Sequence, residues 1–146
     1  MTQVSSSLSD LVQALNDGID FYMHAAEKTN EKELSEFFQR MSYLKKTIAS
    51  DLNAEIAIEG DRPTESGSFV GSLRKTYTDL KARLGDATPQ YIAELEEHED
   101  RLLAAFREAA LQDKSSRVRD LALMYFPEIE RMHSDMRRLK QSGTLH

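Results

Sequence analysis

Residues 31–59 read EKELSEFFQRMSYLKKTIASDLNAEIAIE, and this stretch decides the fold class. It contains no proline or glycine, and acidic residues gather near its start, as a helix dipole prefers. Its apolar residues recur every three or four positions, which is the period of one helix face. They are Leu34, Phe37, Phe38, Met41, Leu44, Ile48, Leu52 and Ile56. We therefore predict one long amphipathic helix over 31–59, ended by Gly60.

The composition fits one domain of 146 residues, 40% hydrophobic and 30% charged. The absence of cysteine excludes disulfides, thiolate metal sites and thiol nucleophiles. The net charge of −6 argues against a nucleic-acid partner and against an anionic membrane surface. No apolar run is long enough to span a membrane, and no secretory signal is visible. We expect a cytoplasmic protein with no nucleic-acid partner and no membrane partner.

The helical period continues along the rest of the chain, and no alternating strand pattern interrupts it. We predict a single domain over 1–146 with helices over residues 7–28, 31–59, 68–84, 89–112 and 115–141. Ser7 and Asp10 resemble a capping box at the start of helix 7–28. Thr88 and Pro89 are a suitable N-cap and first residue for helix 89–112.

The lengths of the connections predict the topology. The first two long helices and the last two are joined by very short connections, so each pair is expected to form an antiparallel hairpin. The middle connection, 60–88, is long enough to return the chain along the bundle. Helices 31–59 and 89–112 would then run parallel, as in an all-α, ferritin-like four-helix bundle with an additional short helix in its crossover. A simple up-down-up-down bundle with the short helix packed outside is the alternative.

Three charged residues fall where the apolar period requires a buried side chain: Lys45, Glu96 and Glu99. Charged groups are rarely buried unless they are paired. If helices 31–59 and 89–112 run parallel, Lys45 and Glu99 lie at the same level of the bundle. We therefore predict an interior polar cluster of these three residues, with an ion pair between Lys45 and Glu99. Boundary positions with snorkelling side chains are the alternative.

A di-metal site in a helical bundle needs a glutamate from two helices and Glu-x-x-His from the other two. The chain has one such motif, Glu130 with His133, and Glu27 and Glu99 are further candidate ligands. Helix 31–59 supplies no second motif and instead places Lys45 inward, where its charge would repel a metal ion. A complete di-metal site therefore cannot be assembled, and we expect no cofactor.

The helical pattern also predicts whether one histidine and two tyrosines are exposed or buried. His98 is predicted to face solvent, whereas Tyr22 and Tyr125 are predicted to face inward. Each buried tyrosine hydroxyl needs a partner, and Glu96 or Glu99 could supply it.

Three apolar residues, Phe21, Met23 and Tyr43, lie off the predicted faces and are expected to be exposed. They could form a dimer face or a groove for a partner. Pro127 lies inside the last helix, where it removes one backbone hydrogen bond and should kink the helix.

Four stretches carry a family resemblance: DGIDFYMHAAEKTNEKELSEFFQRMS (17–42), ESGSFVGSLRKTYTDLK (65–81), ELEEHEDRLLAAFREAAL (94–111) and PEIERMHSDMRRL (127–139). Together they resemble an uncharacterised bacterial family of ferritin-like four-helix-bundle proteins, catalogued mainly as a domain of unknown function. The resemblance implies the ferritin-like fold and a bacterial, cytosolic protein, and it suggests stress physiology. It implies no established activity.

We therefore predict a non-enzymatic, homodimeric helical bundle that acts through its surface on an unknown protein partner. The alternative is a divergent metal-binding or redox bundle that holds iron or manganese. Its ligands would come from Glu27, Glu96, Glu99, Glu130 and His133.

Overall fold

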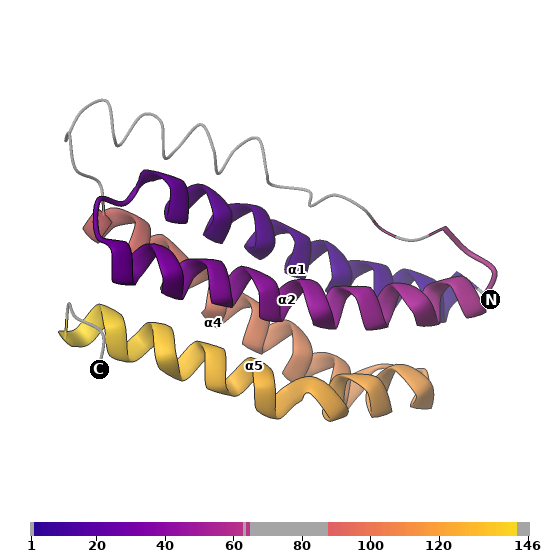
Figure 1. Ribbon diagram of the computed structural model, residues 1–146. Coiled ribbons are helices and arrows are strands. Elements are labelled where there is room, and N and C mark those ends of the chain that lie inside the picture. The colour runs from indigo at the N-terminus through magenta and orange to yellow at the C-terminus, as the bar shows by residue number, and fades with distance from the viewer. Residues whose placement is uncertain (1, 63, 65–87, 143–146) are drawn as a thin grey trace.

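The computed structural model describes residues 2–62, 64 and 88–142. Nearly all of this described chain is helical: α1 (Thr2–Lys28), α2 (Lys32–Ile58), α4 (Thr88–Gln112) and α5 (Ser116–Ser142). The four helices lie side by side as a bundle (Figure 1), which confirms the predicted all-α class. The predicted helix over 68–84 lies outside the described residues.

The helix ends differ from the predictions mainly at the start of α1. The helix begins at Thr2, so the predicted start at Ser7 is wrong. Residues 2–6 contain no proline or glycine that would stop a helix, so the helix continues through them and Ser7 is an interior position instead of the N-cap. Gly60 ends α2 as predicted: its φ is +86°, and its N–H bonds the carbonyl of Ala57 at 2.9 Å. The N–H of Asp61 bonds Ile56 at 3.2 Å, which completes a Schellman motif.

The directions of the helices follow from two tight connections and one long one. Residues 29–31 join α1 to α2, and residues 113–115 join α4 to α5, so each pair is antiparallel (Figure 1). The hydroxyls of Thr29 and Thr88 lie 3.4 Å apart, which places the end of α1 beside the start of α4. Consequently α2 and α4 run parallel (Figure 1).

Thr64 anchors the chain after α2. The side chain of Asn53 accepts the N–H of Thr64 at 2.8 Å and donates to its carbonyl at 3.0 Å. Asn16 of α1 donates to the same carbonyl at 3.2 Å, and the hydroxyls of Ser9 and Thr64 lie 2.6 Å apart. The start of the long connection is therefore held against both α1 and α2.

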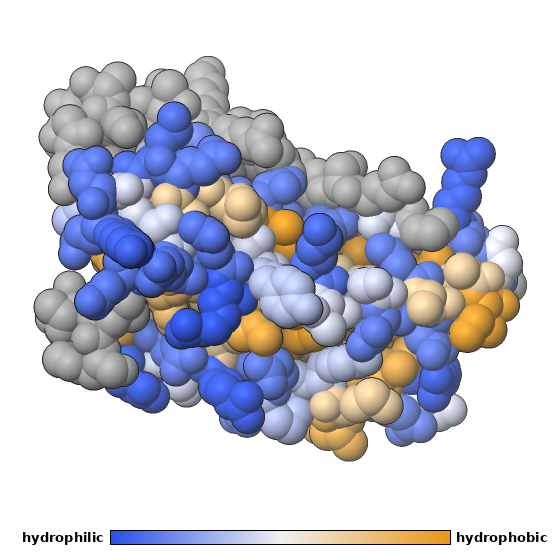
Figure 2. All heavy atoms as spheres, viewed as in Figure 1, coloured by the Kyte–Doolittle hydropathy of each residue, from blue (hydrophilic) through white to orange (hydrophobic). Residues whose placement is uncertain are grey.

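The core lies between the four helices, and it includes Phe21, which is 2% exposed. The prediction that Phe21 is exposed is wrong, because α1 packs against both α2 and α4 and so buries a wider arc than one stripe. Met23 and Tyr43 are exposed as predicted, at 42% and 68%. Figure 2 shows polar side chains over most of one face, with hydrophobic ones near the end of α2 and along α5. Among the described residues, no helix is long and apolar enough to cross a membrane.

Pro127 lies inside α5, which continues without interruption from Ser116 to Ser142. Both Pro127 and Leu123, whose carbonyl loses its hydrogen bond, are exposed. Water can satisfy that carbonyl, so the proline is tolerated on the solvent side of the helix.

Candidate functional site

The centre of the bundle holds a buried lysine. Lys45 of α2 is fully buried, and its Nζ donates to Oε2 of Glu99 on α4 at 2.5 Å. The same Nζ lies 3.4 Å from Sδ of Met132 on α5 and 4.6 Å from the ring centre of Tyr22 on α1. The Tyr22 hydroxyl also donates to Glu99 Oε2, at 2.5 Å. We call Tyr22, Lys45, Glu99 and Met132 the buried cluster; each comes from a different helix.

Gly18 makes room for this cluster. A Cβ at this position would lie 2.8 Å from Cδ and Cε of Lys45 and 2.4 Å from Nε2 of His98. Glycine inside a helix is unfavourable by about 1 kcal/mol relative to alanine, so its presence needs a reason. Here the reason is the close approach of two side chains from other helices to the backbone of α1. In the sequence, the signal for this close approach was a glycine within an otherwise regular helical pattern.

The charges of the pair depend on each other. Burial lowers the pKa of Lys45, and the neighbouring Glu99 offsets only part of that effect. Burial alone would raise the pKa of Glu99, but the charge of Lys45 and the hydrogen bonds from Lys45 and Tyr22 hold it below its usual value. Glu99 is therefore the ionised anchor of the cluster. Its second oxygen, Oε1, is buried and has no hydrogen-bond partner within the described part of the chain.

His98 lies next to the buried cluster and not in solvent, so the predicted exposure is wrong. Its ring is 5% exposed and packs 6.4 Å from Phe21 and 6.5 Å from Tyr22, between ring centres. Burial lowers the pKa of His98 to about 4, although the charge of Glu99 opposes this shift. The ring is therefore neutral at neutral pH. The prediction failed because α4 packs against α1 as well as α5, and so buries two faces.

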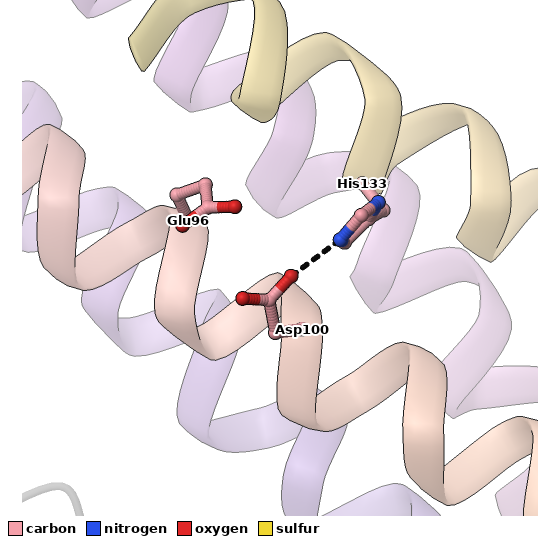
Figure 3. A group of neighbouring side chains, drawn as sticks. All are labelled: Glu96, Asp100 and His133. Carbon is pink, nitrogen blue, oxygen red and sulfur yellow. Dashed lines mark hydrogen bonds and ion pairs between the residues drawn. The ribbon is translucent and has the colours of Figure 1, made fainter. Parts of the chain in front are cut away.

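Glu96 takes part in a different group from the one predicted. It lies on α4 but bonds Lys140 of α5, with Nζ 3.3 Å from its Oε1. Its neighbours are Asp100, one turn along α4, and His133 of α5, whose Nε2 is hydrogen-bonded to Asp100 (Figure 3). One donor atom from each of Glu96, Asp100 and His133 lies within 4.8 Å of the other two. We call these three residues the α4–α5 polar group.

The other predicted candidates lie apart from both groups. Glu27 and Glu130 are exposed, and neither belongs to the α4–α5 polar group. The Tyr22 hydroxyl bonds Glu99, one of its two predicted partners, but the hydroxyl of Tyr125 donates to Asp51 at 2.8 Å. Burial and this hydrogen bond raise the pKa of Tyr125 to about 12. Asp100 was missed because it lies outside the apolar stripe and outside any Glu-x-x-His spacing.

The two groups differ in what they can do chemically. Lys45 and Glu99 are each 0% exposed, so a substrate cannot reach them in this structure. Their pairing joins α2 to α4, and Tyr22 and Met132 connect the pair to α1 and α5. The α4–α5 polar group is partly open, with His133 13% and Asp100 49% exposed, and its oxygen and nitrogen atoms could bind a cation.

Comparison with known proteins identifies the family to which this chain belongs. A family model described as Domain of unknown function (DUF2383) matches residues 3–112, about three-quarters of the chain, so the chain belongs to that family. Neither the curated proteins nor the solved structures contain a significant match. The family match therefore establishes membership without supplying an activity.

The Lys45–Glu99 pair can be tested by a double-mutant cycle. We expect Lys45→Met to lower the free energy of unfolding by about 3–5 kcal/mol, because it leaves the carboxylate of Glu99 buried without its counter-charge. The double variant Lys45→Met/Glu99→Gln should recover about 2 kcal/mol or more, since the amide still accepts the Tyr22 hydroxyl and no charge stays buried. Urea unfolding followed by circular dichroism measures both changes.

Lys46→Met is the matched control, because Lys46 is the exposed neighbour of Lys45 on the same helix. Its effect should stay within about 0.5 kcal/mol. The cycle also needs the single variant Glu99→Gln. A loss in the double variant equal to the sum of the losses in Lys45→Met and Glu99→Gln would contradict an energetic coupling between Lys45 and Glu99.

His98 should make the protein sensitive to mild acid. Its folded pKa of about 4 lies below the ordinary histidine value of 6.5, so between these pH values the unfolded chain binds a proton that the folded chain does not. Stability is therefore lost as the pH falls from 6.5 towards 4, by up to about 3 kcal/mol.

The His98→Gln variant cannot take up this proton and should show a shallower fall in unfolding free energy over the same pH range. Chemical unfolding at several pH values measures both slopes. Equal slopes in the wild type and the variant would show that His98 is not buried in its neutral form.

Proposed function

We propose that this protein is a ferritin-like four-helix bundle that works without an interior metal centre and acts as a homodimer through its surface. The observation that carries the proposal is the position of Lys45 Nζ, bonded to Glu99 and surrounded by side chains of all four helices. An interior di-metal site needs carboxylates and histidines at this level. A lysine there repels a cation and neutralises the charge of the buried Glu99 carboxylate.

The surface part of the proposal rests on the outer face of α5. Leu123 and Met124 are both 62% exposed, and Pro127 lies exposed one turn further along. Exposed Arg117 precedes this apolar patch and exposed Glu130 follows it. In a two-fold, antiparallel pairing of α5 helices centred between Leu123 and Met124, Arg117, which pairs with Glu55 of its own chain, would lie at the same level as Glu130 of the second copy. Such a pairing would bury the exposed apolar side chains of the two copies against each other, with opposite charges towards the two ends of the patch.

A divergent metal-binding bundle that holds iron or manganese is the competing function. The α4–α5 polar group favours it, because two carboxylates and a histidine lie together there. That group lies between two helices only, whereas a redox di-metal centre draws ligands from all four. The bacterial origin, the cytoplasmic location and the stress-related role that the family resemblance implies stay predictions.

The absence of an interior metal is tested on tag-free protein carrying His133→Ala, which removes the only histidine of the α4–α5 polar group. After exposure to Fe(II) or Mn(II) and desalting, elemental analysis should find no stoichiometric metal. The melting temperature should not change on addition of a chelator. Retained stoichiometric metal together with a chelator-sensitive melting temperature would overturn the proposal.

The dimer is tested by sedimentation velocity. We expect the wild type to sediment as a dimer and Leu123→Lys to shift it towards the monomer, because two lysines would then face each other at the centre of the interface. Leu111→Lys is the matched control: Leu111 is a 70% exposed leucine on α4, outside the patch, and its replacement should leave the dimer intact. A monomeric wild type, or equal effects of the two variants, would contradict this pairing.

A further inference from the structure

The α4–α5 polar group has the donor set and spacing of a metal site. Glu96 and Asp100 are four residues apart, so they project from the same side of α4, and His133 faces them from α5 (Figure 3). The three donor atoms lie within 4.8 Å of one another. Donors around one tetrahedral Zn²⁺ are about 3.4 Å apart, given metal–ligand distances of about 2.1 Å. Small side-chain rotations therefore bring all three onto one ion.

The charge of this group also favours a divalent cation. Two carboxylates face a histidine, and the nearest lysine, Lys140, is a single positive charge 3.3 Å from Glu96. The Lys140 side chain is 50% exposed, so it can swing into solvent when a cation enters. A divalent ion would balance both carboxylates, which one lysine cannot do.

The surroundings hold the donors in place while leaving an opening. Glu96 is 7% exposed, so packing restricts its side chain, whereas Asp100 on the outer side is half exposed. The short connection at Asp113–Ser115 keeps α4 and α5 in register, with Ser115 capping α5 by accepting the N–H of Val118 at 3.3 Å. Three protein donors leave at least one coordination position for water.

We infer that Glu96, Asp100 and His133 form a surface site for one divalent transition-metal ion of the zinc class. An imidazole nitrogen among the donors favours such an ion over Mg²⁺ or Ca²⁺, which prefer oxygen ligands throughout. The Nε2 atom of His133 would bind the metal in its unprotonated form. A bound ion would connect α4 and α5 at the surface. This site is separate from the buried cluster and does not depend on the proposed metal-free interior.

Calorimetric titration of the tag-free full chain with Zn²⁺ alone tests the inference. We expect one equivalent to bind to the wild type, and both His133→Ala and Asp100→Asn to weaken binding at least tenfold, since each removes a ligand. Asp100→Asn changes an exposed residue with little change of size, so it tests the site even if His133→Ala unfolds the protein. Titration with Co²⁺ should give visible absorption bands that His133→Ala abolishes.

Two controls separate this site from other ligands. Glu130→Gln removes the glutamate of the Glu130-x-x-His133 motif, which is exposed and outside the group, and should leave the affinity unchanged. His146→Ala removes the histidine at the end of the sequence and should also have no effect. The inference is wrong if the wild type shows no saturable binding. It is equally wrong if Glu130→Gln weakens binding as much as Asp100→Asn does.

Discussion

A lysine charge buried among four helices is the constraint on which the rest of this structure depends. An unpaired ammonium group in a protein interior is strongly unfavourable, so Lys45 requires a carboxylate at the same level of the bundle. Glu99 meets this requirement because α2 and α4 lie in a register that brings their midpoints to the same level. Gly18 must then stay without a side chain, because Lys45 and His98 occupy the space beside α1. The pair therefore constrains the register of α2 against α4 and the residue type at position 18 of α1.

Helix α4 contributes residues to both the buried cluster and the α4–α5 polar group. Glu99 and His98 face the interior, while Glu96 and Asp100 lie towards α5, within a turn and a half of one another. The interior group is closed to solvent and its charges are matched. The outer group is partly open and has more negative than positive charge. This difference in access explains why we assign a structural role to one and ion binding to the other.

Membership of a family described only as a domain of unknown function leaves the assignment of function to the chemistry of the chain. The proposed function and the inferred metal site rest on different residues, so each can fail without the other. The interior proposal depends on Lys45, and the surface site depends on Asp100 and His133.

The sequence by itself determined the helices and the need for a partner of Lys45. Apolar residues at helical spacing and the Schellman glycine Gly60 are local signals, because they depend on residues within a few turns of one another. The sequence could not decide which faces of α1 and α4 are buried. Each of these helices packs against two neighbours. The assumption that a helix buries only one apolar face therefore placed Phe21 and His98 in solvent, although both are buried. It also could not find the α4–α5 polar group, because the contact of Asp100 with His133 joins residues 33 positions apart. Only the packing of one helix against another brings such residues together, and no spacing within a single helix records it.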